Sequence, residues 1–171
     1  MSDMDIQAFL SCHAIELVRH EHAAVFTVAE SELISPALPG IKTKNLFLRD
    51  KKGHNHFLVT VPADLAIDLL ELGDTLGAGR LSFASPERLL NHLGVSPGSV
   101  SVLGLLNDPT HKVQCVIEQT LWEAQAIQAH PLINTATMIV PHHALEKFLA
   151  ATGHVPRVIA LARCPVSQAA A

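Results

Sequence analysis

The fold of this chain is decided by one stretch, Lys44-Asn-Leu-Phe-Leu-Arg-Asp-Lys-Lys-Gly53, which is followed by His56-Phe-Leu-Val-Thr-Val61. Two β-prone runs, residues 45–49 and 56–61, flank a short polar segment that ends in glycine. Glycine adopts the backbone angles that tight turns require. The pattern therefore predicts a β-hairpin.

Working outward from this hairpin, hydrophobic periodicity predicts the remaining elements. Helices are expected at residues 4–20, 64–76, 86–93 and 141–151, with a helical turn from residue 29 after a strand at 24–28. A loop is expected at residues 35–40, and further strands are expected at 80–84, 99–106, 113–118, 135–140 and 158–161. Helices and strands mix without a regular βαβ rhythm. We therefore expect an α+β fold, a curved, barrel-like mixed sheet surrounded by helices, in a single domain over residues 1–171.

The composition excludes several classes of protein. No apolar run approaches the roughly 20 residues that span a bilayer, and the N-terminus does not resemble a signal peptide. The three widely spaced cysteines, Cys12, Cys115 and Cys164, suit free thiols in a reducing cytoplasm. A formal net charge of −4 excludes a broad basic surface for nucleic acid, so any RNA contact must be local.

Lys44 and Asn45 are candidate binding residues at the entrance of the first hairpin strand. An ammonium group is a compact charge that suits a phosphate oxygen, and an amide offers both donors and an acceptor. Five of the twelve basic residues fall within residues 42–52. This cluster is either a local phosphate-binding patch or a solvated hairpin tip.

His130 begins a second informative stretch, His130-Pro-Leu-Ile-Asn-Thr-Ala-Thr137. The following proline biases His130 toward an extended backbone, and a histidine can transfer a proton near neutral pH. Asn134 adds an amide and Ala136 a small side chain that we expect beside His130. A surface or structural histidine is the alternative, because the chain has eleven.

Gly98-Ser-Val-Ser-Val-Leu-Gly104 places glycines at both ends of an apolar run. Backbone N–H groups at Gly98 can approach a ligand and stabilise an oxyanion. Ser99 and Ser101 add hydroxyls, and with Val100 they are candidate substrate-binding residues. The alternative is a strand with glycines for turning and close packing. The paired Lys-Asn and His-Pro segments together suggest hydrolysis of an ester on a phosphorylated carrier.

A metal site has less support, although histidines are plentiful. His20-Glu-His22, His54-Asn-His56 and His142-His143 lack the ligand spacing of metalloenzymes. We expect no metal and no cofactor.

Seven segments, in order over roughly residues 15–162, resemble the YbaK/ProX family of aminoacyl-tRNA deacylases, in particular the free-standing prolyl-tRNA editing proteins. They begin at His22, Lys44, Leu76, Leu93, Leu106, His130 and Gly153. The resemblance implies the α+β fold of the editing domain associated with prolyl-tRNA synthetase. It also implies metal-independent hydrolysis of the ester bond that joins a wrongly attached alanine, or cysteine, to proline tRNA.

By position, the resemblance assigns Lys44 to the phosphate next to the terminal adenosine, Asn45 to the neighbouring asparagine of that motif, and His130 to the aminoacyl pocket. It assigns Gly98 to the loop whose amides position the carbonyl or the water. The expected partners are proline tRNA and prolyl-tRNA synthetase. Family members usually carry a proline where this chain has Val102. The alternative function is a tRNA- or aminoacyl-binding module of the same fold with weak catalysis.

Overall fold

The computed structural model describes residues 3–27, 29–30, 33 and 37–163, and it is built on one mixed sheet of eight strands. The strand order is β1-β7-β6-β2-β3-β5-β8, and β4 pairs with β2. The strands are β1 (Val18–Glu21), β2 (Ile41–Asp50), β3 (His56–Pro62), β4 (Leu81–Phe83), β5 (Val113–Glu118), β6 (Ala126–Ala129), β7 (Ala136–Pro141) and β8 (Arg157–Ile159). In the described chain β1 and β8 stand at the two ends of this order, so the sheet is open.

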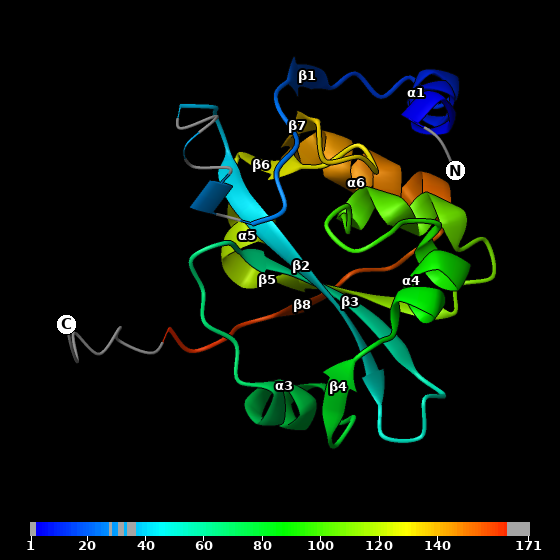
Figure 1. Ribbon diagram of the computed structural model, residues 1–171, viewed down its shortest axis with the longest axis vertical. Helices are drawn as coiled ribbons and strands as arrows, with labels where there is room; N and C mark the ends of the chain where they lie inside the picture. Colours follow the sequence, from blue (N-terminus) through cyan, green and yellow to red (C-terminus); the bar gives the residue numbers. More distant parts are fainter. Residues whose placement is uncertain (1–2, 28, 31–32, 34–36, 164–171) are drawn as a thin grey trace.

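Strand β2 connects the two halves of the sheet. Its first residues, Ile41 and Lys42, pair in parallel with β6, whereas Thr43 to Arg49 pair antiparallel with β3. Figure 1 shows β2 running across the molecule from the β6 and β7 end to the hairpin turn. The predicted hairpin is confirmed, and its first strand is longer than expected.

Helices pack on both sides of this sheet (Figure 1). They are α1 (Asp3–Cys12), α3 (Leu69–Leu76), α4 (Pro86–Leu93), α5 (Gln119–Glu123), α6 (His142–Thr152) and the 3-10 helix η1 (Val102–Asn107). A large core joins α1, α4, η1 and α6 to one face, and a smaller core joins α3 and β4 to the other. Every residue of β3 is buried, as expected for a strand covered on both faces. The predicted α+β class with a mixed sheet is confirmed.

The predicted helix at residues 4–20 is wrong in its second half. Helix α1 ends at Cys12, and Ala14 takes a left-handed backbone with φ of 51°. The chain then forms β1, whose Val18 lies opposite Ile139 of β7. Pairing with a distant strand overrides the local helical pattern.

The predicted strand at residues 99–106 is also wrong. Ser101 accepts a hydrogen bond from the N–H of Leu103 and begins the 3-10 helix η1. Val102, Leu103 and Leu105 of this helix are almost completely buried. A short apolar run is compatible with a buried strand or a buried helix, and here the serine cap selects the helix.

Other predicted boundaries differ less. The strand expected at residues 24–28 does not form over residues 24–27, and Val28 lies outside the described residues. Residues 35–36 of the expected loop also lie outside them. The helix expected from residue 64 begins at Leu69 as α3, because Asp68 caps it. Helix α5 and strand β6 were not predicted. The helix between Ser85 and Gly94, strand β5 and helix α6 match the expectations closely.

Cys12 and Cys115 are free thiols, and Cys164 lies outside the described residues. Among the helices of the described chain, none is both long and apolar enough to cross a bilayer.

Candidate active site

A pocket of about 240 Å³ opens at the point where β2 passes from one half of the sheet to the other. Four separate parts of the chain line most of it: the loop before residue 28, strand β2, the loop before η1, and the end of β6. The lining residues are Val25, Phe26, Thr27, Lys42, Thr43, Lys44, Asn45, Ala63, Gly98, Val100 and His130. None of them carries a carboxylate. The structure therefore brings together Lys44, Asn45, Gly98, Val100 and His130, which the sequence had separated.

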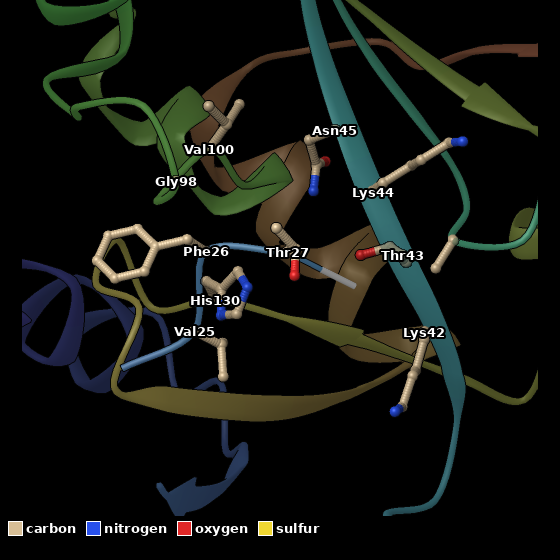
Figure 2. A pocket seen from close by; sticks show the side chains of 11 residues that line it. Val25, Phe26, Thr27, Lys42, Thr43, Lys44, Asn45, Gly98, Val100 and His130 are labelled. Carbon is tan, nitrogen blue, oxygen red and sulfur yellow. The ribbon is translucent and has the colours of Figure 1, made fainter. Parts of the chain in front are cut away.

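The alternation of β2 divides its pocket residues between two faces. Thr43 and Asn45 point toward His130, whereas Lys44 extends to the other side of the strand (Figure 2). The hydroxyl of Thr43 donates to the carbonyl of Gln128 at 2.7 Å, which ties β2 to β6. The neutral groups thus face the interior of the pocket, and the ammonium of Lys44 lies at its margin.

Asn45 is held by β3. Its Oδ1 accepts a hydrogen bond of 2.7 Å from the hydroxyl of Thr60, the residue directly opposite it in the hairpin register. Its Nδ2 has no acceptor in the described part of the chain. Asn45 therefore offers free N–H donors at the pocket.

The ammonium groups of Lys42 and Lys44 form no ion pair or hydrogen bond with any described residue, although the backbone carbonyl of Lys42 accepts from the N–H of Ala63 at 2.9 Å. They are two residues apart on β2, and their side chains extend in different directions from the strand (Figure 2). Lys51 and Lys52 lie in the hairpin turn, and Arg49 near it donates to the carbonyls of Asp50 and Lys51. The basic cluster of residues 42–52 is thus split into a pair at the pocket and a group at the other end of β2.

His130 is held in one orientation by its backbone surroundings. Its Nδ1 lies 3.1 Å from the carbonyl oxygen of Ala136, and a carbonyl can only accept, so Nδ1 carries the proton. Burial lowers the pKa of His130, the bond to Ala136 raises it in part, and a charge on His22 lowers it further. Neutral His130 therefore has Nε2 as an acceptor, able to bind a water or amine proton but unable to donate to a carbonyl.

Gly98 forms the wall opposite β2 and packs against Phe26. Its φ is +92°, and a Cβ there would lie 3.2 Å from Cδ1 of the Phe26 ring. The backbone N–H groups of Gly98 and Val100 have no acceptor in the described part of the chain. The loop therefore combines close aromatic packing with amides that are free to bind a ligand.

The segment from His22 to Thr27 was not predicted as a pocket wall. It is tied to the stretch after His130 by hydrogen bonds from the N–H of His22 to the carbonyl of Thr135 and from the N–H of Val25 to the carbonyl of Asn134. His22 lies 2.9 Å from the hydroxyl of Thr137, with its ring centre 6.5 Å from that of His130. The family-like segment beginning at His22 was the available signal, but it was interpreted as a strand.

Four predicted substrate-binding residues do not line the pocket. Ser99 and Ser101 are buried in the loop and cap region before η1, Ala136 is completely buried, and Asn134 contributes a carbonyl to the Val25 anchor. Ala136 acts on the site through its carbonyl, which holds His130. Ser99, Ser101 and Ala136 are thus buried, and none of the four residues is among those that line the cavity.

Several other histidines form local contacts away from the pocket. His154 lies 3.2 Å from buried Asp108, and His111 lies 2.9 Å from the carbonyl of Thr152 at the end of α6. His56 stacks with Phe47 and accepts from Arg88. Across the residues that the structure describes, no three His, Cys, Asp or Glu side chains are grouped to hold a metal ion.

Known proteins are similar to this chain in sequence, and solved structures are similar to it in fold. Residues 22–148 match the aminoacyl-tRNA editing domain family. The prolyl-tRNA editing protein ProX of Acetoanaerobium sticklandii is 40% identical over 141 residues, which cover 82% of this chain and 86% of that protein. The prolyl-tRNA synthetase associated domain-containing protein 1 of Danio rerio is 38% identical over 157 residues, covering 91% and 85%. A solved structure, described as a candidate trans-editing enzyme for prolyl-tRNA synthetase, superposes with a TM-score of 0.68 at 21% identity, covering 95% of this chain and 99% of that one.

Proposed function

The chain belongs to the aminoacyl-tRNA editing domain family, and from this premise we propose that it hydrolyses the ester bond of proline tRNA charged with a wrong amino acid. Water adds to the ester carbonyl, the bond to the ribose oxygen breaks, and free amino acid and uncharged tRNA are released. We assign alanine as the first substrate and cysteine as the second, with no metal required. Proline tRNA is the expected partner, and a contact with prolyl-tRNA synthetase is part of the proposal.

One observation supports this proposal most directly. Lys44, Asn45, Gly98 and His130 come from three distant segments, and they line one pocket. The ammonium groups of the two lysines at the pocket have no partner in the described chain, so they are available to phosphates. Neutral donors inside the pocket suit the ester group of the substrate, and ammonium groups at its margin suit the phosphates of the nucleic acid to which that ester is attached.

The proposed roles follow from the direction of each group. Lys44 holds the phosphate next to the terminal adenosine, so that remote binding energy orients the ester. Asn45 Nδ2 and the amides of Gly98 and Val100 supply donors to the developing oxyanion, where one donor is worth about 3 kcal/mol. His130 Nε2 accepts a proton from the attacking water or from the substrate amine, and the ribose hydroxyl of the tRNA assists in activating the water.

Selection against proline is assigned to pocket size. A volume of about 240 Å³ is below the roughly 300–1,000 Å³ of pockets for drug-sized ligands. Val25, Phe26 and Val100 provide apolar walls that a larger or branched side chain would meet. Exclusion by these walls spares the correctly charged product, whereas attraction for one methylene is worth only about 1–3 kcal/mol.

The test is a deacylation assay with purified protein and proline tRNA carrying alanine, cysteine, serine or proline. We expect the alanyl ester to be hydrolysed fastest and the prolyl ester at the uncatalysed rate. Equal rates on the alanyl and prolyl esters would refute the assigned selectivity.

The alternative, a binding module with weak catalysis, has one observation in its favour. Val102 stands where family members usually carry proline, and it is 1% exposed at the start of η1. Binding of proline tRNA without faster hydrolysis of any of the four esters would support this alternative.

A further inference from the structure

Asn45 carries the only amide side chain among the described residues that line the pocket. An amide has a donating end and an accepting end of nearly the same shape. Rotation by half a turn would therefore replace two N–H donors with an oxygen that repels phosphate, carbonyl and oxyanion groups. What the pocket offers to a substrate depends on which end of Asn45 faces it.

Thr60 is placed to decide this orientation. It lies directly opposite Asn45 in the antiparallel β2–β3 pair, and its side chain is 0% exposed. Its hydroxyl donates to Asn45 Oδ1 at 2.7 Å and makes no other side-chain hydrogen bond in the described chain. The partner of Asn45 is thus a buried group on a strand enclosed on both faces.

The flipped orientation of the Asn45 amide is disfavoured because it would leave a buried donor without an acceptor. If Nδ2 faced Thr60, the amide would donate to the hydroxyl oxygen, and the hydroxyl proton would lose its acceptor. The cost of an unsatisfied buried donor makes the flipped orientation roughly 5- to 150-fold less populated than the observed one. Thr60 therefore keeps Nδ2 turned toward the pocket, the direction that it takes in Figure 2.

We propose that Thr60 is a positioning residue, whose buried hydroxyl fixes the Asn45 amide so that its N–H groups donate to an oxygen of the substrate at the reacting ester. Thr60 itself does not contact substrate. The proposal rests on the proposed function for the identity of the substrate, but the orientation of the amide can be tested without one.

The kinetic test uses Thr60→Val, which keeps the β-branched shape and removes the hydroxyl. In single-turnover hydrolysis of alanyl proline tRNA we expect a fall of about tenfold, because a small misplacement of a catalytic group costs up to about 100-fold. The Kd for uncharged proline tRNA should stay within twofold, since the lysines are intact. Thr60→Ser, which keeps the hydroxyl, should restore most of the rate.

A double-mutant cycle separates positioning from a purely structural role. In an Asn45→Ala background, Thr60→Val should change the rate by less than twofold. Thr152→Val is the control, because it removes the hydroxyl of a threonine that does not line the pocket; this hydroxyl donates to the carbonyl of Leu149 at the end of α6 and lies 3.0 Å from Nδ1 of His154. It should lower the melting temperature and leave the rate unchanged. A rate loss in Thr60→Val of less than twofold, or equal losses with and without Asn45, would overturn the proposal.

Crystals of the free protein at about 1.2 Å or better, where amide nitrogen and oxygen can be assigned from the data, provide the substrate-free test. We expect Oδ1 toward Thr60 in the wild type and a rotated or mixed amide in Thr60→Val. Nδ2 toward Thr60 in the wild type, or an unchanged amide in the variant, would overturn the proposal. Absence of hydrolysis by the wild type would instead refute the proposed function, and the crystal test would still decide the role of Thr60.

Discussion

The split of the basic cluster predicts how tRNA binding depends on salt. Lys42 and Lys44 are at the pocket, with ammonium groups that have no partner in the described chain, whereas Lys51 and Lys52 lie at the hairpin turn. At about 3.3 Å per residue, roughly 20 Å of strand separates Lys44 from the turn. The Debye length is about 10 Å at 0.1 M salt, so the turn contributes little at the pocket.

The magnitude follows from the number of phosphates neutralised. Two lysines on a single-stranded acceptor end give a slope of log affinity against log salt of about −1.4, since each phosphate contributes about −0.7. Between 50 and 200 mM salt the affinity should therefore fall about sevenfold. Lys44→Met should halve the slope to about −0.7, and Lys51→Met, the matched control, should leave it unchanged.

The measurement is fluorescence anisotropy with labelled, uncharged proline tRNA over a range of potassium chloride concentrations. A wild-type slope steeper than about −2.1 would show at least a third phosphate contact and refute the count of two contacts, and a slope steeper than about −5 would show a broad basic surface. A slope that becomes shallower in Lys51→Met than in the wild type would show that the hairpin turn also contacts the acceptor stem.

Four other predictions concern activity and stability. Lys44→Ala should abolish single-turnover deacylation without lowering the melting temperature, and Lys44→Arg should recover little because a guanidinium is wider and planar; a wild-type rate in Lys44→Ala would contradict the assigned role. Gly98→Ala should lose about 1–3 kcal/mol of stability and react more slowly, because alanine is strained at φ of +92° and its Cβ would crowd Phe26; unchanged urea unfolding would count against this. Burial lowers the pKa of His56 to about 4. As the pH is lowered from 6.5 to 4, this histidine is protonated in the unfolded chain but not in the folded one, so the free energy of unfolding should decrease by up to about 3 kcal/mol. His56→Gln should flatten this dependence. EDTA should leave the deacylation rate unchanged, and a loss that zinc reverses would contradict metal-independent hydrolysis.

The hairpin was predictable because local signals agree there. Alternating β-prone residues and a glycine turn specify β2 and β3, and the register places Asn45 opposite Thr60. The run at residues 99–106 gave a wrong strand, since an apolar run does not reveal whether a serine cap will start a helix. Strand β6 was missed because Ala126–Ala129 is short and has a weak pattern, so its pairing with β7 is set by tertiary contacts.

The candidate site was predictable where a residue carries a charge, an amide or a ring nitrogen in a family-like motif. Lys44, Asn45 and His130 were found in this way. Phe26 and Thr27 were missed because an exposed aromatic in a loop looks like any surface residue until the fold places it against Gly98. The tautomer of His130 also depends on a contact with Ala136 that no spacing rule reveals.

The strand order also determines when the pocket can form during synthesis. Strand β2 is made early, but it pairs with β6, and His130 is held by the carbonyl of Ala136 at the start of β7. At about 5–20 residues per second, the ribosome reaches His130 roughly 4–17 s after Asn45. Contacts so distant in sequence close late, because loop-closure entropy opposes them until the partner strand is available. Hydrolysis should therefore appear only once β7 has left the ribosome, so that a growing chain that still lacks β7 does not present a complete editing site to the charged tRNAs around it.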